Sequence, residues 1–432
     1  MSEQIVININ RLGPVRNARI TLGQFMIFSG ASGLGKSYTA MLVHYVYRIL
    51  SGEELEGFFK EKQATLGDVS RFEDTAMHVV FSCESSELVQ WINAHARTYL
   101  VNMLAHPQLD MDVQIEFPAL SKTLLFEYGH IEQVEQDDIS RPNLSPRGRL
   151  KLSPFGGATT FSLTLLPQIN YALFSHVLSI HMADLYGLRL ITSTFFLPPS
   201  RGAIMQIPMD KQLSVFQSTP MYSEFIETFA RIKSFREVDI SVINTKSIAD
   251  GRIEEFEGEL YYNYHDVPIP ISAAASSIKE IAPFVMLAEK GLSRYFATLF
   301  EEPESHLHPE LQGAVVDVMA QMLHHGTHLQ ITTHSDYVMR RINDLIYLYR
   351  LSEAWKIEKY AKFCEQRGID GSITLDPDII KAYFFTPEDG GLSSIVEQDI
   401  SNGIPFSTFE KVINTNFPIS ADIYEQFEIM KQ

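Results

Sequence analysis

The sequence has few cysteines and no long apolar run. Only Cys83 and Cys364 occur among 432 residues, far apart and without metal-ligand spacing, so neither a disulfide framework nor a zinc site is expected. The nearest approach to a membrane span, FSLTLLPQINYALF, is interrupted and too short, and nothing resembles a signal peptide. We therefore expect two packed thiols, no membrane partner and a cytoplasmic location.

An excess of positive charge is also missing. The chain carries 35 Lys and Arg against 53 Asp and Glu, and its formal net charge of −18 would repel a polyanion on average. This excludes a protein whose whole surface coats DNA. One basic stretch remains, SRPNLSPRGRLKLSP, with Arg141, Arg147, Arg149 and Lys151 among loop-favouring residues. Two interpretations stay open for it: a local contact with nucleic acid or phosphate, or a solvated loop.

What the sequence does contain is a phosphate-binding motif. The stretch GASGLGKSY matches G-x-x-x-x-G-K-[ST], between the strand-like QFMIFSG and the helical pattern of SYTAMLVHYVYRIL. Glycines let successive N–H groups point at phosphates, and the helix adds its positive end. Lys36 is expected to reach the β- and γ-phosphates of ATP and Ser37 to bind Mg²⁺. The predicted nucleotide-binding residues are Gly30, Ala31, Ser32, Gly33, Leu34, Gly35, Lys36, Ser37 and Tyr38.

A carboxylate pair follows a second apolar strand, in LFEEPESHLHPELQ. Glu301 and Glu302 stand at the end of this strand, where ligands of parallel α/β sheets gather. The first carboxylate is expected to hold Mg²⁺ and the second to deprotonate the attacking water. The nearby His306 and His308 diverge at a helix start with Pro309 in its first turn, so we do not expect them to bind a metal.

A histidine ends a third apolar strand, LQITTHSD. His334 follows the carboxylate strand by one predicted helix, and a histidine at a strand end can hydrogen-bond a γ-phosphate. We expect it to sense that phosphate. The catalytic residues predicted from these motifs are Lys36, Glu302 and His334.

Together, EEPESHLHPELQ and ITTHSD resemble the Walker B, D-loop and H-switch of ABC-class ATPases in the RecF and OLD group. That group includes the ATPase subunits of Septu and some retron antiphage systems. The resemblance spans most of the chain in order. It implies that two copies sandwich ATP, and that Ser276 and Ser277 of AAASSIKEI touch the γ-phosphate held by a second subunit. The family's glycine after the first serine is Ser277 here, and the glutamine-loop has only Gln90 and Arg201 regions as candidates.

The predicted fold is α/β, an ABC-type P-loop ATPase head with a mixed or parallel sheet flanked by helices, plus an inserted α+β lobe. The head comprises residues 1–60 and 271–350, the inserted lobe residues 61–270, and a carboxyl-terminal lobe residues 351–432. That lobe includes IKAYFF and GIPFSTFEKVI. No coiled-coil arm or internal repeat is visible.

The predicted function is an ATPase switch that dimerises around ATP and controls a separate effector, a nuclease or toxin in antiphage defence. The alternative is a RecF-like ATPase acting on DNA ends. A transporter subunit would need an LSGGQ-type signature, which is missing. An OLD-type nuclease would use Asp376 and Asp378 of LDPD, which instead favours a turn or helix cap.

Overall fold

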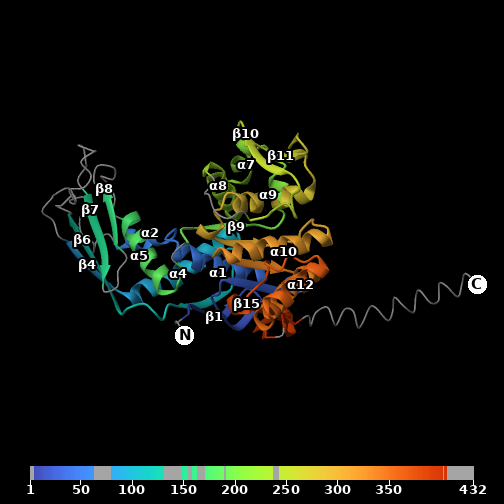
Figure 1. Ribbon diagram of the computed structural model, residues 1–432. Coiled ribbons are helices and arrows are strands. Elements are labelled where there is room, and N and C mark those ends of the chain that lie inside the picture. The colour runs from blue at the N-terminus through green and yellow to red at the C-terminus, as the bar shows by residue number, and fades with distance from the viewer. Residues whose placement is uncertain are drawn as a thin grey trace, which may run out of the picture.

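The computed structural model describes residues 4–62, 79–130, 147–153, 158–162, 171–188, 191–236, 243–401 and 403–405. Within these residues the largest sheet has nine strands (Figure 1). In spatial order they are β5 (Met111–Glu116), β1 (Val6–Leu12), β2 (Val15–Thr21), β16 (Ser393–Glu397), β15 (Ile380–Pro387), β3 (Phe25–Gly30), β14 (His328–Thr333), β13 (Phe296–Glu301) and β9 (Ser193–Leu197). The strands from β15 to β9 are parallel, while β5, β1 and β2 pair antiparallel. The predicted α/β class is confirmed.

The parallel strands are buried on both faces, which explains the apolar runs of β3 and β13, while β14 also buries polar residues such as Gln330. Alternate residues enter two different hydrophobic cores, as a side-chain period of two requires. Met26 and Leu299 point to one core, whereas Ile27 and Phe300 point to the other. The sheet therefore separates two layers of helices.

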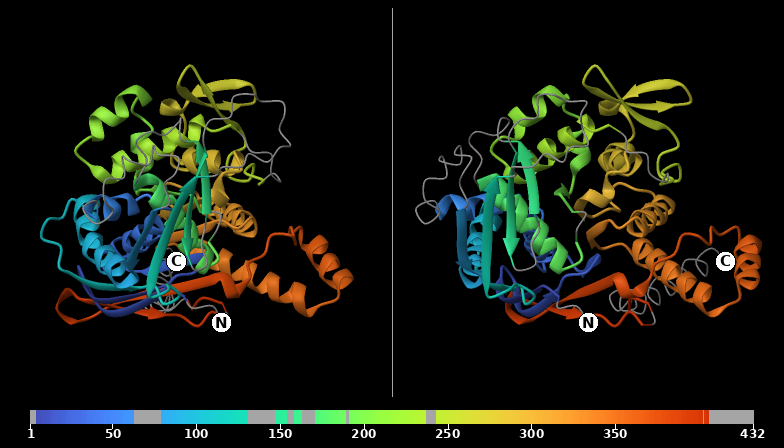
Figure 2. Two further views of the ribbon diagram at one scale, coloured as in Figure 1. Left: turned by 90° about the vertical axis from the view of Figure 1, so that its left-hand side faces the viewer. Right: turned by 60° about the vertical axis from the view of Figure 1, so that its left-hand side comes forward.

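Four helices contribute to the first core: α1 (Lys36–Leu50), α2 (Leu55–Glu61), α4 (Ser85–Met103) and α5 (Tyr171–Leu185). The second core holds side chains of α8 (Pro220–Ser234), α9 (Ser276–Glu289), α10 (Pro309–His324) and α11 (Asp336–Ala354). The remaining described helices are α6 (Arg201–Ile204), α7 (Met209–Phe216) and α12 (Ile357–Arg367), and the 3₁₀ turns are η2 (Ile271–Ala273), η3 (Ser293–Tyr295), η4 (Pro377–Ile379) and η5 (Asp389–Gly391). The two views of Figure 2 show α11 and α12 extending from one side of the molecule.

Two smaller antiparallel sheets flank this arrangement. One contains β4 (Val79–Glu84), β6 (Thr123–His130), β7 (Arg147–Ser153) and β8 (Ala158–Ser162), and lies beside α2 and α5 (Figure 1). The other contains β10 (Arg252–Phe256), β11 (Glu259–Tyr264) and β12 (Val267–Pro270). The third strand accommodates Pro268 and Pro270 because it is an edge strand.

Strand pairing crosses the predicted domain boundaries. Residues 61–270 do not form one separate lobe, because β5 and β9 are strands of the nine-stranded sheet. Residues 351–432 are likewise not a separate lobe, since β15 and β16 pair inside that sheet and β15 lies next to β3. Most of GIPFSTFEKVI lies outside the described residues. Local sequence patterns indicate strands but not which distant strands pair, so the sequence alone did not show that these segments join one sheet.

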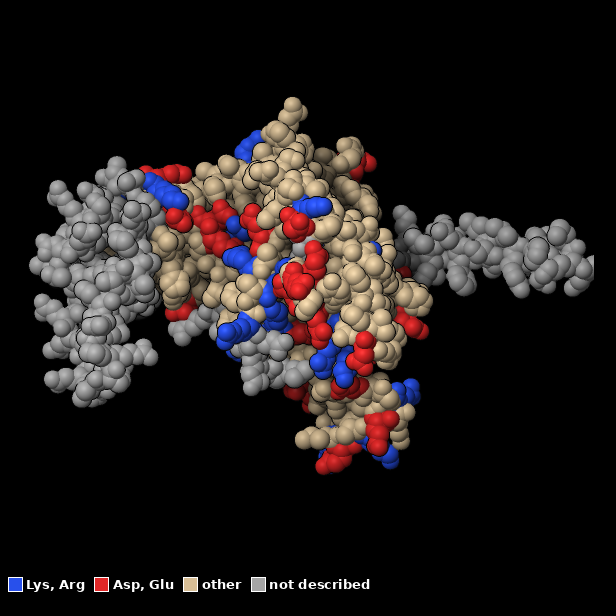
Figure 3. All heavy atoms as spheres, turned by 90° about the horizontal axis from the view of Figure 1, so that it is seen from above, with Lys and Arg blue, Asp and Glu red and all other residues tan. Residues whose placement is uncertain are grey.

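Charged side chains are interspersed on the face seen from above. Figure 3 shows acidic and basic groups beside one another there, without a broad field of one sign. Arg141 of the basic stretch lies outside the described residues, and Arg147, Arg149 and Lys151 fall in β7, which pairs with β6 and β8. Cys83 and Cys364 are buried free thiols, as predicted. Among the described helices, none has the length and apolar character needed to cross a membrane.

His328 gives a pH prediction for the fold. Burial lowers the pKa of its imidazole from 6.5 to about 4, so the unfolded chain binds this proton more readily. The neutral imidazole therefore stabilises the folded state above pH 6.5. The free energy of unfolding falls by up to about 3 kcal/mol as the pH falls from 6.5 toward 4. We expect the free energy of unfolding of His328→Gln, measured with urea, to fall less than that of the wild type over this window.

The matched control is His308→Gln, whose side chain is 70% exposed. It should retain the pH dependence of the wild type. Parallel curves for wild type and His328→Gln would contradict the assigned titration.

Candidate nucleotide site

The predicted phosphate-binding loop joins β3 to α1, in the order of strand, loop and helix that its motif requires. Two glycines are sterically necessary. Gly30 has φ +132° and a Cβ there would lie 2.6 Å from the Phe385 carbonyl oxygen, and Gly35 has φ +90° with Val15 Cγ2 2.7 Å from the same position. Gly35 also precedes the first turn of α1. The loop can therefore approach an anion closely at the positive end of a 15-residue helix.

Lys36 lies at the first position of α1, and its side chain is turned into the loop. Its Nζ donates to the carbonyl oxygens of Gly30 at 3.1 Å and Ala31 at 2.7 Å. Burial lowers the pKa of this amine to about 8, although Glu302 and other carboxylates raise it. The ammonium is thus a partly desolvated cation facing a group of carboxylates.

Strand register brings the other predicted residues to the same edge. Glu301 pairs in register with Thr332, and Thr332 with Phe28, so the carboxyl ends of β13, β14 and β3 are aligned. Glu301 is 3% exposed, and the Ser37 side chain hydrogen-bonds its carboxylate. Burial raises the pKa of Glu301 to about 7, with the Ser37 hydrogen bond opposing the shift. The two predicted Mg²⁺ ligands are therefore in direct contact.

Glu302 follows the strand in a left-handed backbone conformation, with φ 44°. A non-glycine residue held there typically costs about 1 to 3 kcal/mol. The turn is fixed because the Glu302 N–H donates to the Thr332 carbonyl at 3.0 Å, and Ser305 Oγ donates to Glu302 Oε2 at 3.2 Å. The carboxylate is 43% exposed and its Oε1 lies 3.8 Å from His334 Nε2. The predicted base and the predicted sensor are neighbours.

His334 also faces the phosphate-binding loop. Burial lowers the pKa of its imidazole, Lys36 lowers it further, and Glu302 and a hydrogen bond with the Gly30 backbone raise it. A neutral imidazole beside Lys36 can donate or accept a hydrogen bond at a phosphate oxygen. The structure thus brings together Lys36, Ser37, Glu301, Glu302 and His334.

Glu304 is a site residue that the sequence interpretation missed. Its Oε1 accepts hydrogen bonds from the His334 N–H at 2.7 Å and the Thr333 hydroxyl at 2.9 Å. Burial raises the pKa of this carboxylate, and its Oε2 has no hydrogen-bond partner among the described residues. Glu304 therefore ties the turn after β13 to the strand end that carries His334. The only signal in the sequence is a third acid in EEPES.

Arg201 and Glu280 form a second buried link at the site. Arg201 is fully buried, stacks 4.4 Å from the centre of the Phe300 ring, and donates to the carbonyl oxygens of Glu301 at 2.9 Å and Glu280 at 2.8 Å. Its Nε also lies 3.5 Å from Glu280 Oε2. Burial lowers the pKa of Arg201 to about 10, while Glu280 raises it. The pair joins α9 to the end of β13.

Gln90, the other glutamine-loop candidate, is exposed on α4.

The remaining predicted residues lie elsewhere. Ser276 is exposed in the first turn of α9, and Ser277 is partly buried beside it. The Tyr38 ring packs against Gly13 and His106 instead of lining the loop. Pro309 starts α10 as predicted, with His308 at its N-cap. Asp376 caps η4 by accepting the Asp378 N–H at 2.9 Å, which confirms the predicted turn.

The donor set fits Mg²⁺, which prefers oxygen ligands. Glu301 Oε1 is buried without a hydrogen-bond partner among the described residues, and the Ser37 hydroxyl touches the same carboxylate. In the part of the chain that the structure describes, no three His, Cys, Asp or Glu side chains are arranged to hold a metal by themselves. Phosphate oxygens and water would have to complete the coordination, as is usual for Mg²⁺ at nucleotide sites.

Comparison with known families finds one matching domain. Residues 205–339 match the AAA ATPase domain family. The matched segment is less than a third of the 432 residues; it contains Ser276, Glu301, Glu302 and His334, and the phosphate-binding loop precedes it. The match supports an ATPase that binds ATP. Among curated proteins, none matches the chain.

Several solved structures of Smc heads share a distant likeness with the chain. An Smc head bound to the C-terminal winged-helix domain of ScpA is 12% identical, with 92% of this chain and 98% of that chain covered and a TM-score of 0.36. The Smc head domain from Thermotoga maritima is 11% identical, with 92% and 99% covered and a TM-score of 0.31. An Smc head with an extended coiled coil, bound to a ScpA domain derived from Pyrococcus furiosus, is 12% identical, with 97% and 100% covered and a TM-score of 0.33. Likenesses this low identify no substrate or partner of this chain.

The Arg201–Glu280 pair yields a stability prediction. Arg201→Met leaves the Glu280 carboxylate buried without its cation, and breaking such a pair typically costs about 3 to 5 kcal/mol. The double variant Arg201→Met/Glu280→Gln removes both charges, so its loss in unfolding free energy should be smaller than the sum of the two single losses. Arg231→Met, with a side chain 56% exposed, is the control and should change stability little. Additive losses in the double variant would contradict the coupling.

Proposed function

We propose that this protein binds ATP with Mg²⁺, hydrolyses ATP, and uses the cycle as a conformational switch acting on a partner. The observation that carries the proposal is the convergence of three parallel strand ends, β3, β14 and β13, on one phosphate-binding loop. Lys36, Glu302 and His334 come from three different segments and interact electrostatically with one another. The AAA ATPase match over residues 205–339 supports the same function.

Triphosphate binding follows from the loop and the helix. The loop N–H groups and the start of α1 provide donors for phosphate oxygens, and Lys36 adds a full positive charge. Its Nζ can leave the Gly30 and Ala31 carbonyls for phosphate oxygens, which are stronger acceptors. Ser37 and Glu301 would hold Mg²⁺, whose positive charge would stabilise the charge that develops on the phosphates.

Glu302 is placed to act as the base. Its carboxylate is partly exposed, so a water molecule can reach it, and the left-handed turn projects it beyond the strand end. The carboxylate accepts a proton as the water oxygen bonds to the γ-phosphorus, and the bond from that phosphorus to the bridging oxygen breaks. ADP and phosphate are the products. His334, 3.8 Å from Glu302, orients the γ-phosphate and reports its loss.

A second copy completes the site in this proposal. Ser276 lies exposed at the start of α9, and α9 belongs to the core on the opposite face of the sheet from α1. An exposed helix start with free N–H groups suits a phosphate presented by another subunit. ATP then favours the closed dimer, and hydrolysis releases it. The Arg201–Glu280 pair connects α9 with Glu301 within each subunit.

In this proposal a partner molecule must recognise the change of conformation. The resemblance of the motifs to ATPases of antiphage systems supports a separate nuclease or toxin in the cytoplasm as the effector in antiphage defence. Co-purification from native cells with and without ATP tests this part of the proposal. Recovery of a nuclease or toxin supports it, whereas recovery of repair or replication proteins would contradict it.

Glu302→Gln separates binding from hydrolysis. The amide cannot accept the water proton, so we expect ATP turnover to fall by about 10² to 10⁴-fold while ATP affinity is retained. The variant should accumulate as a dimer with ATP and Mg²⁺ in light scattering. Glu310→Gln, with a side chain 90% exposed on α10, is the control and should behave as wild type. Unchanged turnover and unchanged assembly in Glu302→Gln would refute the assigned base.

Ser37→Ala and Glu301→Gln test the metal ligands. Each removes an oxygen donor of the pair that is in contact in the structure. We expect both variants to bind a fluorescent ATP analogue in EDTA as wild type does, but to lose most of the gain in affinity that added Mg²⁺ gives. Titrations with and without Mg²⁺ measure this difference. An undiminished Mg²⁺ effect in both variants would show that the metal lies elsewhere.

A further inference from the structure

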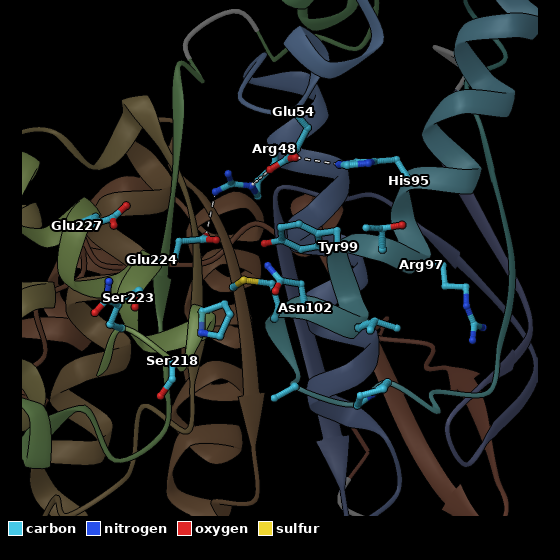
Figure 4. A pocket seen from close by; sticks show the side chains of 17 residues that line it. Arg48, Glu54, His95, Arg97, Tyr99, Asn102, Ser218, Ser223, Glu224 and Glu227 are labelled. Atoms are coloured by element: carbon cyan, nitrogen blue, oxygen red, sulfur yellow. Dashed lines mark hydrogen bonds and ion pairs between the residues drawn. The ribbon is translucent and has the colours of Figure 1, made fainter. Parts of the chain in front are cut away.

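A large groove lies between α4 and α8, far along α1 from the phosphate-binding loop. Its volume is about 1070 Å³, and its walls are formed by α4, by α8 and by the turn before α8 (Figure 4). Arg48, near the end of α1, and Glu54 form its floor. We call it the α4–α8 groove. None of its lining residues belongs to the candidate nucleotide site.

The floor of the groove contains more carboxylates than permanent cations. Arg48 donates from Nε to Glu54 at 2.6 Å, and its Nη1 lies 3.0 Å from Glu224 and 3.2 Å from Glu53. Burial opposes ionisation of Glu54 and Glu224, but hydrogen bonds from His95 and His44 and the charge of Arg48 hold the pKa of each carboxyl below 4.5. Glu53 lies outside the lining and is also 3.8 Å from Arg231 Nη2. Within the lining, the guanidinium of Arg48 faces the carboxylates of Glu54 and Glu224, so this part of the floor is acidic.

An unpartnered hydroxyl points to a missing ligand. Tyr99 is 7% exposed, lines the groove, and has no hydrogen-bond partner for its hydroxyl among the described residues. In Figure 4 this hydroxyl is directed toward Glu224 across the groove. A buried phenol normally finds a partner, because leaving it unpaired costs about 1 to 3 kcal/mol. A hydrogen-bond donor of a ligand, placed beside Glu224, could also donate to the Tyr99 hydroxyl oxygen.

The rim of the groove adds a further negative charge. Glu227, one turn of α8 beyond Glu224, is exposed, and Ser223 and Asn102 offer further polar groups. Arg97 also belongs to the lining, but Figure 4 places it on the side of the groove away from Glu224 and Glu227. The acidic half of the groove is therefore open to a cation.

We propose that the α4–α8 groove docks a basic segment of a partner protein, with a Lys or Arg side chain set between Glu224, Glu227 and Tyr99. The volume is at the upper limit of small-molecule pockets, about 1,000 Å³, and suits several residues of an extended chain. The net charge of −18 favours a basic partner in this groove and opposes a nucleic acid.

The position of the groove connects docking with the nucleotide. α1 starts at Lys36 in the phosphate-binding loop and carries Arg48 twelve residues later, about 18 Å along the helix. Arg48 in turn holds Glu224 of α8. A partner residue bound at Glu224 and the phosphates bound at Lys36 therefore act on opposite ends of one rigid helix. The docking site itself does not depend on the proposed ATPase function.

A peptide titration tests the proposal on the full chain without ATP. The probe is a fluorescein-labelled peptide of sequence Gly-Ser-Arg-Lys-Ser-Arg-Lys-Gly, and its uncharged twin carries Gln at each basic position. We expect the wild type to bind the basic peptide and not the twin. Glu227→Lys should weaken binding by about tenfold or more, because it reverses the charge at the rim. Asn102→Trp, which fills the groove from α4, should also weaken it.

The matched control is Glu365→Lys, which makes the same change of net charge at an exposed position on α12. It should bind the peptide as wild type does. Equal weakening in Glu365→Lys and Glu227→Lys would overturn the proposal, since binding would then reflect overall charge alone. Preference of the wild type for a single-stranded oligonucleotide over the peptide would also overturn it. Thermal unfolding and binding of a fluorescent ATP analogue should be unchanged in Glu227→Lys, which separates this test from that of the nucleotide site.

Discussion

The parallel register of β3, β14 and β13 is the constraint on which the rest of the site depends. The residues of each strand are almost all buried; β3 and β13 are largely apolar until their last residues, whereas β14 also buries Gln330. Polar side chains stand at the same edge of all three strands, because Glu301 pairs with Thr332 and Thr333 pairs with Ser29. Since parallel strands end at one edge, three distant segments of the chain deliver their polar groups to one place. A slip of one residue would turn these groups toward the other core.

Charged groups of both signs are buried at this edge of the sheet. Lys36 is a cation with a lowered pKa, and Glu301 and Glu304 are acids with raised pKa values, all principally because of burial. Each group would be relieved by an opposite charge, the amine by phosphate oxygens and the carboxylates by a divalent cation. The hydrogen bonds of Glu304 and Arg201 hold the surrounding backbone in place. The arrangement is therefore organised for a charged ligand before one binds.

The strand and helix motifs could be predicted because they are local. The glycines of GASGLGKSY, the acids after YFATLF and the histidine after LQITT each follow an apolar run, and the structure places them together. Glu304, Glu280 and the role of Arg201 could not be predicted, because their importance comes from burial against segments distant in the sequence. For the same reason the sequence did not show that β5, β9, β15 and β16 belong to the nine-stranded sheet, since that depends on pairing between distant segments.

The central claim is that these strand ends surround one triphosphate. Its most direct test is a crystal structure of the wild-type chain with a non-hydrolysable ATP analogue and Mg²⁺. The account predicts the γ-phosphate within hydrogen-bonding distance of Lys36 and His334, the metal on Ser37 and Glu301, and Ser276 of a second copy at the same phosphate. A nucleotide bound away from Lys36, or His334 and Glu302 turned away from its γ-phosphate, would contradict it.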